Sequence, residues 1–196
     1  MQRQKPRTLF QPRQMAMVGL LSSISILLSL TPLGYIPILP INPTIMHVPV
    51  IIGAIIEGPL AGGVIGGIFG LSSLIRAFMT PTPTNFIFWN PLISIGVRIM
   101  VGVVSAYVYR AVKNKKAGVA ITAVVGTLVN TIGVLGLDYL FYLARYAQAL
   151  GITEAAARTF ILTVVGTNGI PEAIISALIA VPVITAYKKI YPKKLK

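Results

Sequence analysis

Long apolar runs alternate with short polar or proline-rich segments along the whole chain. We count six such runs, at residues 14–31, 47–57, 60–78, 88–110, 118–143 and 159–187. About 20 apolar residues are needed to cross the hydrocarbon core of a bilayer, and only the second run is much shorter than that. The pattern therefore predicts an all-α integral membrane protein, with six transmembrane helices in a single domain that covers residues 1–196.

The segments around these runs carry local signals of their own. Residues 32–46 hold four prolines among Ile and Leu, a pattern too interrupted for a helix and too apolar for a solvated linker. We expect this segment to pack as a loop over the outer face. Residues 79–87 predict a second outer loop, and residues 144–158 are expected to include a short amphipathic helix. The short second run is expected to tilt or to pack partly against protein.

Basic residues predict the orientation of the helices. Thirteen of the 17 Lys and Arg residues lie in three clusters, before the first run, after the fourth and after the sixth. The clusters consist of Arg3, Lys5, Arg7 and Arg13, then Arg110, Lys113, Lys115 and Lys116, and finally Lys188, Lys189, Lys193, Lys194 and Lys196. Short Lys/Arg-rich segments are retained in the cytoplasm, and even numbers of crossings separate the clusters. We therefore predict two cytoplasmic termini, with basic tails at about 1–13 and 188–196.

Charge and composition narrow the classes of partner. A net charge of +13 would suggest nucleic-acid binding in a soluble chain. Here the basic residues border long uncharged runs, so the headgroups of the lipid bilayer are the expected partner and nucleic acid is not. The chain has no cysteine and a single histidine, His47, so neither a thiolate site nor a histidine cluster for a metal is expected.

Catalytic chemistry is not expected either. The chain has only four acidic residues, which lie far apart in sequence: Glu57, Asp138, Glu154 and Glu172. No HExxH, GxSxG or Walker A motif is present. We predict a protein that is not an enzyme and uses no cofactor. Any energised transport would need another subunit or an ion gradient.

Small residues indicate where helices come close together. Gly62, Gly66 and Gly70 recur every four residues, so one face of the third helix is nearly bare backbone and is suited to tight packing. A second small-residue patch lies on the first helix and consists of Gly19, Ser22 and Ser23. This second patch could serve either packing inside the protein or contact with a partner protein, and the sequence favours neither interpretation.

One positive charge lies inside the fourth run. Arg98 is about ten residues into the run, which at ~1.5 Å per residue is ~15 Å deep. An unpaired cation at that depth costs at least ~2.5–3.5 kcal/mol on insertion scales. Asn90 and Ser94 precede Arg98 at intervals of four, so a helix would place the three on one face. Trp89 lies beside that face at the expected outer interface.

The last two runs also carry polar residues. The fifth has Asn130 and Asp138 on one face with Tyr139 near the outer mouth, and the sixth has Asn168 and Glu172 four residues apart. Because hydrocarbon offers these groups no hydrogen bonds, they should converge on one another or on a cavity. A structural ion pair between Arg98 and Glu172 is one interpretation. A ligand pocket that opens outward also explains the polar track from Arg98 to Asn90.

Several segments together resemble a known family. They are residues 19–23 (GLLSS), 47–54 (HVPVIIGA), 57–62 (EGPLAG) and 168–172 (NGIPE). The chain resembles the substrate-binding S component of energy-coupling factor (ECF) vitamin transporters, and the likeness covers nearly its whole length. The resemblance implies a six-helix monomer in a prokaryotic plasma membrane that captures one vitamin at its outer face. It also implies a transmembrane coupling (T) subunit and two cytoplasmic ATPase subunits as partners.

The same resemblance assigns roles to parts of the chain. A small-residue AxxxA pattern on the first helix of the family contacts the coupling subunit, and Gly19 and Ser23 have that spacing here. The loop after the first helix is implied to cover the vitamin, and helices four to six to supply most contacts. Residues 86–91 (FIFWNP) resemble members of the pantothenate and riboflavin-type branch.

The charge of Arg98 favours pantothenate as the ligand. A guanidinium can hold the carboxylate of pantothenate by a charge-assisted fork, while its hydroxyls and amide meet the asparagines. Riboflavin is the nearest alternative, and its flavin would stack on Trp89, Tyr35, Tyr139 or Tyr142. A stand-alone secondary transporter would usually show repeated halves, which we do not find. A scaffold protein without a ligand would leave the Arg98 track unexplained.

Overall fold

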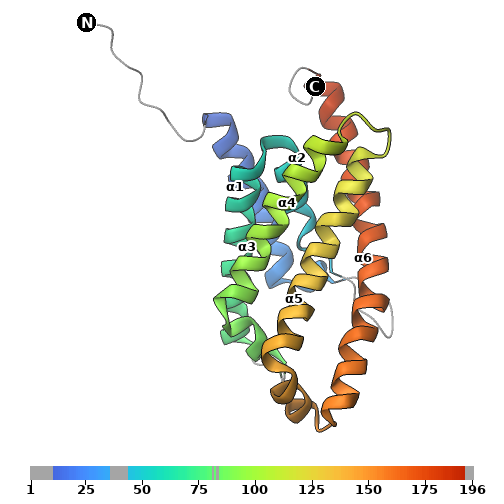
Figure 1. Ribbon diagram of the computed structural model, residues 1–196. Helices are drawn as coiled ribbons and strands as arrows, with labels where there is room; N and C mark the ends of the chain where they lie inside the picture. Colours follow the sequence, from blue (N-terminus) through green and yellow to red (C-terminus); the bar gives the residue numbers. More distant parts are fainter. Residues whose placement is uncertain (1–10, 36–43, 81, 83, 193–196) are drawn as a thin grey trace, which may run out of the picture.

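The computed structural model describes residues 11–35, 44–80, 82 and 84–192, and every regular element in these ranges is helical (Figure 1). The elements are α1 (Pro12–Leu30), η1 (Pro32–Gly34), α2 (Val48–Glu57), α3 (Pro59–Met79), η2 (Asn85–Trp89), η3 (Leu92–Gly96), α4 (Val97–Val112), α5 (Gly118–Leu150) and α6 (Glu154–Ile190). The prediction of an all-α protein is confirmed. The predicted loop over residues 32–46 has its centre, residues 36–43, outside the described residues.

The long helices run up and down in one bundle. The start of α1, the end of α6 and the connection between α4 and α5 lie at the same end (Figure 1). The side chain of Arg13 links the first two of these, because its Nη2 donates to the hydroxyl of Tyr187 at 2.9 Å and its guanidinium lies 3.9 Å above the ring of Tyr191. The described parts of the three basic clusters therefore gather at one end, as an even number of crossings requires.

Within the part of the chain that the structure describes, five helical segments are long and apolar enough to cross a membrane. They are α1, α3, the continuous stretch Leu92–Val112, α5 and α6. The second predicted span is the exception, since α2 has ten residues and is about 15 Å long at ~1.5 Å per residue. It begins deep inside the bundle, after His47, and ends at Gly58, whose φ of 92° favours glycine. The six-span count and the cytoplasmic termini stay predictions.

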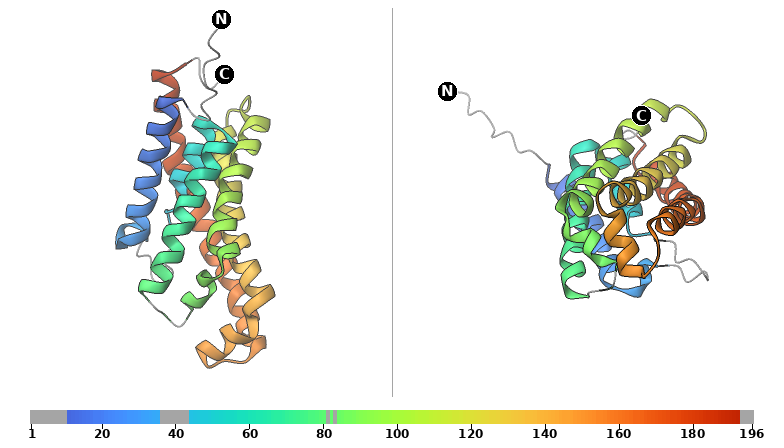
Figure 2. Two further views of the ribbon diagram at one scale, coloured as in Figure 1. Left: turned by 90° about the vertical axis from the view of Figure 1, so that its left-hand side faces the viewer. Right: turned by 60° about the horizontal axis from the view of Figure 1, so that its bottom comes forward.

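The connection between α5 and α6 differs from its prediction. No separate amphipathic helix forms over residues 144–158. Instead α5 continues to Leu150 and α6 begins at Glu154. Gly151 ends α5 in the left-handed conformation, and the hydroxyl of Thr153 caps α6 by accepting from the amide of Ala156 at 3.2 Å. These two caps make a tight turn, and the resulting hairpin extends beyond the other helices (Figure 2).

Bare backbone on α3 sets its distance from α4. A Cβ atom on Gly66 would overlap the carbonyl oxygen of Arg98, and one on Gly70 would lie 2.5 Å from the carbonyl oxygen of Ser94. A Cβ atom on Gly62 would lie 2.9 Å from the carbonyl oxygen of Gly102. The prediction that this glycine face packs tightly is confirmed. Because of this close approach, the backbone of α3 at Gly66 lies directly against the backbone of α4 at Arg98.

We expect Gly66→Ala to destabilise the protein by about 1–3 kcal/mol, because the new methyl group forces α3 and α4 apart. The measurement is the thermal unfolding midpoint of the purified protein in detergent. Gly63→Ala, one turn away, is the matched control, because its Cβ atom would lie 3.5 Å from the nearest side-chain atom. Equal midpoints for the two variants would contradict the packing argument.

Candidate functional site

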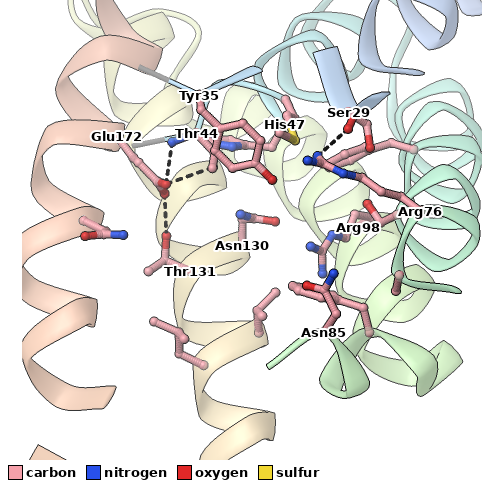
Figure 3. Close-up of a pocket in the computed structure, with 18 of the residues that line it drawn as sticks. Ser29, Tyr35, Thr44, His47, Arg76, Asn85, Arg98, Asn130, Thr131 and Glu172 are labelled. Carbon is pink, nitrogen blue, oxygen red and sulfur yellow. Dashed lines mark hydrogen bonds between the residues drawn. The ribbon is translucent and has the colours of Figure 1, made fainter. Parts of the chain in front are cut away.

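A cavity of about 460 Å³ lies between α1, α3, α4, α5 and α6, on the side of the bundle away from the termini. Its volume falls in the range of small-molecule sites. Polar groups from many parts of the chain line it (Figure 3): Ser29, Tyr35, Thr44, His47, Ser73, Arg76, Thr80, Thr82, Asn85, Arg98, Asn130, Thr131, Asn168 and Glu172. Apolar groups fill the rest of the wall: Met46, Phe69, Ala77, Phe88, Val134, Leu135 and Val164.

Arg98 is the buried cation of the cavity. Its side chain is 6% exposed, and its Nη1 donates to the carbonyl of Ile93 at 2.7 Å. The rings of Phe69 and Phe88 lie 5.6 and 5.2 Å from the guanidinium carbon. Its Nε has no hydrogen-bond partner among the described residues. The guanidinium therefore keeps donor capacity for a ligand, beside two aromatic rings.

A second arginine lines the same cavity and was not predicted to do so. The last turn of α3 brings Arg76 to the cavity wall. Its Nη1 donates to the carbonyl of Ser29 near the end of α1, and its guanidinium lies 5.1 Å from the ring centre of Tyr35. The sequence contains one signal for it: Arg76 continues the polar face of α3 that includes Ser72 and Ser73.

Glu172 lies on the opposite side of the cavity from the two arginines (Figure 3). Its Oε1 accepts from the backbone amide of Thr44 at 2.8 Å and from the hydroxyl of Thr44 at 2.9 Å, and its Oε2 accepts from Thr131 at 3.1 Å. Within the described residues, Glu172 thus takes its hydrogen bonds from threonines rather than from Arg98. The carboxylate fastens the segment before α2 to α6.

His47 and Asn130 complete the interior of the site. The Nε2 of His47 lies 2.9 Å from the hydroxyl of Thr127, while its Nδ1 is buried without a partner among the described residues. The amide oxygen of Asn130 also has none. Within those residues, no group of three acidic or histidine side chains could hold a metal ion. The site is therefore built from hydrogen-bonding groups and three charges.

The structure separates Asn90, Ser94 and Trp89 from the cavity lining. Asn90 donates to the hydroxyl of Tyr142 at 3.2 Å, and the hydroxyl of the fully buried Ser94 donates to the carbonyl of Asn90 at 3.0 Å. Trp89 stacks on Phe78 and donates to the carbonyl of Ala77. The expected shared face fails because Asn90 lies before the helix, in an extended backbone conformation with ψ of 116°, and the next helical element begins at Leu92.

Asp138 and Tyr139 also lie away from the cavity lining. Asp138 is fully buried, and neither carboxylate oxygen has a hydrogen-bond partner among the described residues. Tyr139 packs against the apolar cluster at the hairpin end, 5.7 Å from the guanidinium of Arg158. Of the nine predicted ligand residues, four line the cavity, and they come from three different helices: Arg98, Asn130, Asn168 and Glu172.

The small-residue patch on α1 divides between two faces. Gly19 is exposed, and a Cβ atom there would meet nothing within 4 Å. Ser23 is exposed too, and its hydroxyl donates to the carbonyl of Gly19 at 2.9 Å. Ser22 instead points into the bundle. Gly19 and Ser23 therefore form a flat outer surface that needs no further hydrogen bonds.

The fold and the cavity together define a multi-pass membrane protein with a polar binding cavity between its helices. Residues 13–184 match the family model described as ECF transporter, substrate-specific component. The chain belongs to this family and is a transport protein.

Two bacterial relatives support the assignment. The chain is 32% identical over 164 residues to the pantothenic acid transporter PanT of Lactococcus lactis subsp. cremoris, an alignment that covers 76% of this chain and 80% of that protein. It is 31% identical over 163 residues to the pantothenate transporter PanT of Leuconostoc mesenteroides subsp. mesenteroides, with 78% and 79% covered. Each alignment therefore covers most of this chain and most of the relative.

We expect Glu172→Leu to lower the thermal unfolding midpoint and Glu172→Gln to leave it nearly unchanged. Leucine leaves the donors of Thr44 and Thr131 unpaired, and the buried hydroxyl of Thr131 alone would cost about 1–3 kcal/mol. Glutamine keeps an acceptor oxygen for Thr44, and its amide can donate to Thr131 instead. A midpoint for Glu172→Leu that equals that of the unmodified protein would contradict the fastening role of Glu172.

Proposed function

We propose that this chain is the substrate-binding subunit of an ECF-type transporter for pantothenate. The observation that carries the proposal is the charge balance of the cavity: two cations, Arg76 and Arg98, face one anion, Glu172. A cavity inside a membrane protein is poorly screened by water, so its surplus positive charge favours a ligand with one negative charge. Pantothenate carries a single carboxylate at one end.

The carboxylate of the ligand fits the arginine side of the cavity. The Nη1 of Arg98 donates one hydrogen bond to the carbonyl of Ile93, and its other N–H groups donate none within the described residues. A planar guanidinium matches a carboxylate with two parallel hydrogen bonds. Arg76 adds a second cation at the rim near α1.

The hydroxyl end of the ligand fits the opposite side. The carboxylate of Glu172 has about four acceptor positions, of which Thr44 and Thr131 use three. One position remains for a ligand hydroxyl. Asn130 and Asn168 lie on the wall between the two sides and suit the central amide of pantothenate. The apolar side chains of Val134, Leu135 and Val164 suit its methyl groups.

Riboflavin fits these features less well. It has no carboxylate to balance the second arginine. Of its four expected stacking partners, Tyr35 lines the cavity, whereas Trp89, Tyr139 and Tyr142 do not. The names of both relatives also specify pantothenate.

Transport further requires partners, which we infer from membership of the family. We propose a transmembrane coupling subunit and two cytoplasmic ATPase subunits in a prokaryotic plasma membrane, with both termini of this chain cytoplasmic. The cavity then opens toward the outside. The exposed Gly19 and Ser23 face of α1 is the proposed contact with the coupling subunit.

We expect the unmodified protein to bind pantothenate and Arg98→Gln to bind it roughly 10- to 150-fold more weakly, which corresponds to the ~1.5–3 kcal/mol of a hydrogen bond to a charged group. The measurement is calorimetric titration of the protein in detergent. Pantothenol, in which an alcohol replaces the carboxylate, is titrated in parallel. Arg98→Gln should lose most of the preference for pantothenate over pantothenol.

Two outcomes would count against this proposal. If Arg98→Gln weakens both ligands equally, Arg98 supports the fold and does not read the carboxylate. If riboflavin binds more tightly than pantothenate, the family stands but the ligand is wrong. Arg13→Gln is the matched control, because Arg13 lies at the other end of the bundle.

We expect Gly19→Leu to abolish uptake of radiolabelled pantothenate in cells that express the energising subunits, while calorimetric binding stays within about twofold of the unmodified protein. Leucine fits at this position without an internal clash but protrudes from the contact surface. Undiminished uptake by Gly19→Leu would contradict the proposal that this face of α1 contacts the coupling subunit.

A further inference from the structure

Arg145 lies outside the ligand cavity and has no assigned role. It is exposed near the end of α5, with its guanidinium carbon 4.4 Å from the ring centre of Phe86 and 5.8 Å from that of Trp89. Among the described residues, its guanidinium has no hydrogen bond or ion pair. Two aromatic rings thus hold a cation whose donors all remain available.

The surface next to Arg145 is apolar and exposed. Phe78 stacks on Trp89 with 5.6 Å between ring centres, and it is 62% exposed. Met79 and Leu92 are 73% and 54% exposed. Trp89 itself is 41% exposed and belongs to the residue type that marks the boundary between headgroups and hydrocarbon. A cation therefore lies beside an aromatic boundary residue and a face suited to acyl chains.

We propose that Arg145, Phe86 and Trp89 form a binding site for an anionic phospholipid. The phosphodiester accepts two hydrogen bonds from the guanidinium, and the acyl chains lie along Phe78, Met79 and Leu92. A lipid fits better than a soluble anion because it also covers these apolar side chains, whose exposure to water would be unfavourable. The site is separate from the proposed pantothenate site, since none of Arg145, Phe86 and Trp89 lines the cavity.

The single tryptophan of the chain makes the site directly observable. The protein is reconstituted into phosphatidylcholine vesicles that contain a fixed fraction of brominated lipid, which quenches tryptophan on contact. One preparation holds brominated phosphatidylglycerol and the other brominated phosphatidylcholine. We expect quenching to report an approximately fivefold preference for phosphatidylglycerol beside Trp89, equal to the ~1 kcal/mol of one basic side chain at an anionic surface.

Variants separate this site from general attraction to the membrane. Arg145→Gln should abolish the preference, and Arg145→Lys should keep part of it, because lysine retains the charge without the two-pronged geometry. Arg158→Gln is the matched control: Arg158 is exposed at the same end of the bundle but lies over Tyr139. It should keep the full preference. Added inorganic phosphate should leave the preference unchanged.

The proposal is overturned by any of four results. Equal quenching by the two brominated lipids would show no headgroup selection. A preference that survives in Arg145→Gln would assign it to another residue. Loss of the preference in inorganic phosphate would indicate a site for a free anion. No quenching by either lipid would mean that water or another protein, and not the bilayer, covers Trp89.

Discussion

The close contact between the backbones of α3 and α4 determines the position of the buried guanidinium of Arg98. Gly66 lies against the carbonyl of Arg98, and Gly70 against that of Ser94. Any side chain on these glycines would push α4 outward and carry Arg98 with it. Because the two helices touch through their backbones, the guanidinium is fixed between Phe69 of α3 and Phe88 of η2. A buried cation is costly in a membrane, and this rigid aromatic frame limits the cost by confining the charge to a cavity.

The remaining polar groups depend on segments that are distant in sequence. Thr44 precedes α2, whereas Glu172 lies in the middle of α6, and 128 positions separate them. Their hydrogen bonds bring the chain after α1 back into the bundle. Pro171 lies inside α6 one residue before Glu172, and because proline has no amide hydrogen it cannot donate to the carbonyl of Thr167, one turn earlier in the helix. Thr44, Thr131 and Glu172 thus satisfy one another's hydrogen bonds only in the folded bundle.

Sequence reasoning succeeded where solvation or packing left one outcome. The glycines at positions 62, 66 and 70 face another helix closely, and Arg98, Asn130, Asn168 and Glu172 line one cavity, as the lack of hydrogen bonds in hydrocarbon predicts. The same argument was wrong for Asp138, which is buried away from the cavity lining. The prediction that Asn90 and Ser94 share a helical face with Arg98 was wrong, because it assumed a helix from residue 90, whereas Asn90 has an extended backbone and the next helical element begins at Leu92. It also could not find Arg76 or Thr44 as cavity residues. The position of Thr44 follows from tertiary packing, and the sequence signal for Arg76 is its place on the same face of α3 as Ser72 and Ser73.

The short helix α2 separates the cavity from the end of the bundle that carries the termini. Its nine residues from Val48 to Ile56 are all buried, and the helix runs from the cavity at His47 to the end of the bundle that carries the termini. About 15 Å of close-packed apolar side chains therefore separates the cavity from that end. An ion or proton moving along the bundle axis would have to displace these buried residues of α2. A ligand held in the cavity as proposed above would therefore meet α2 before it could pass to the end of the bundle that carries the termini.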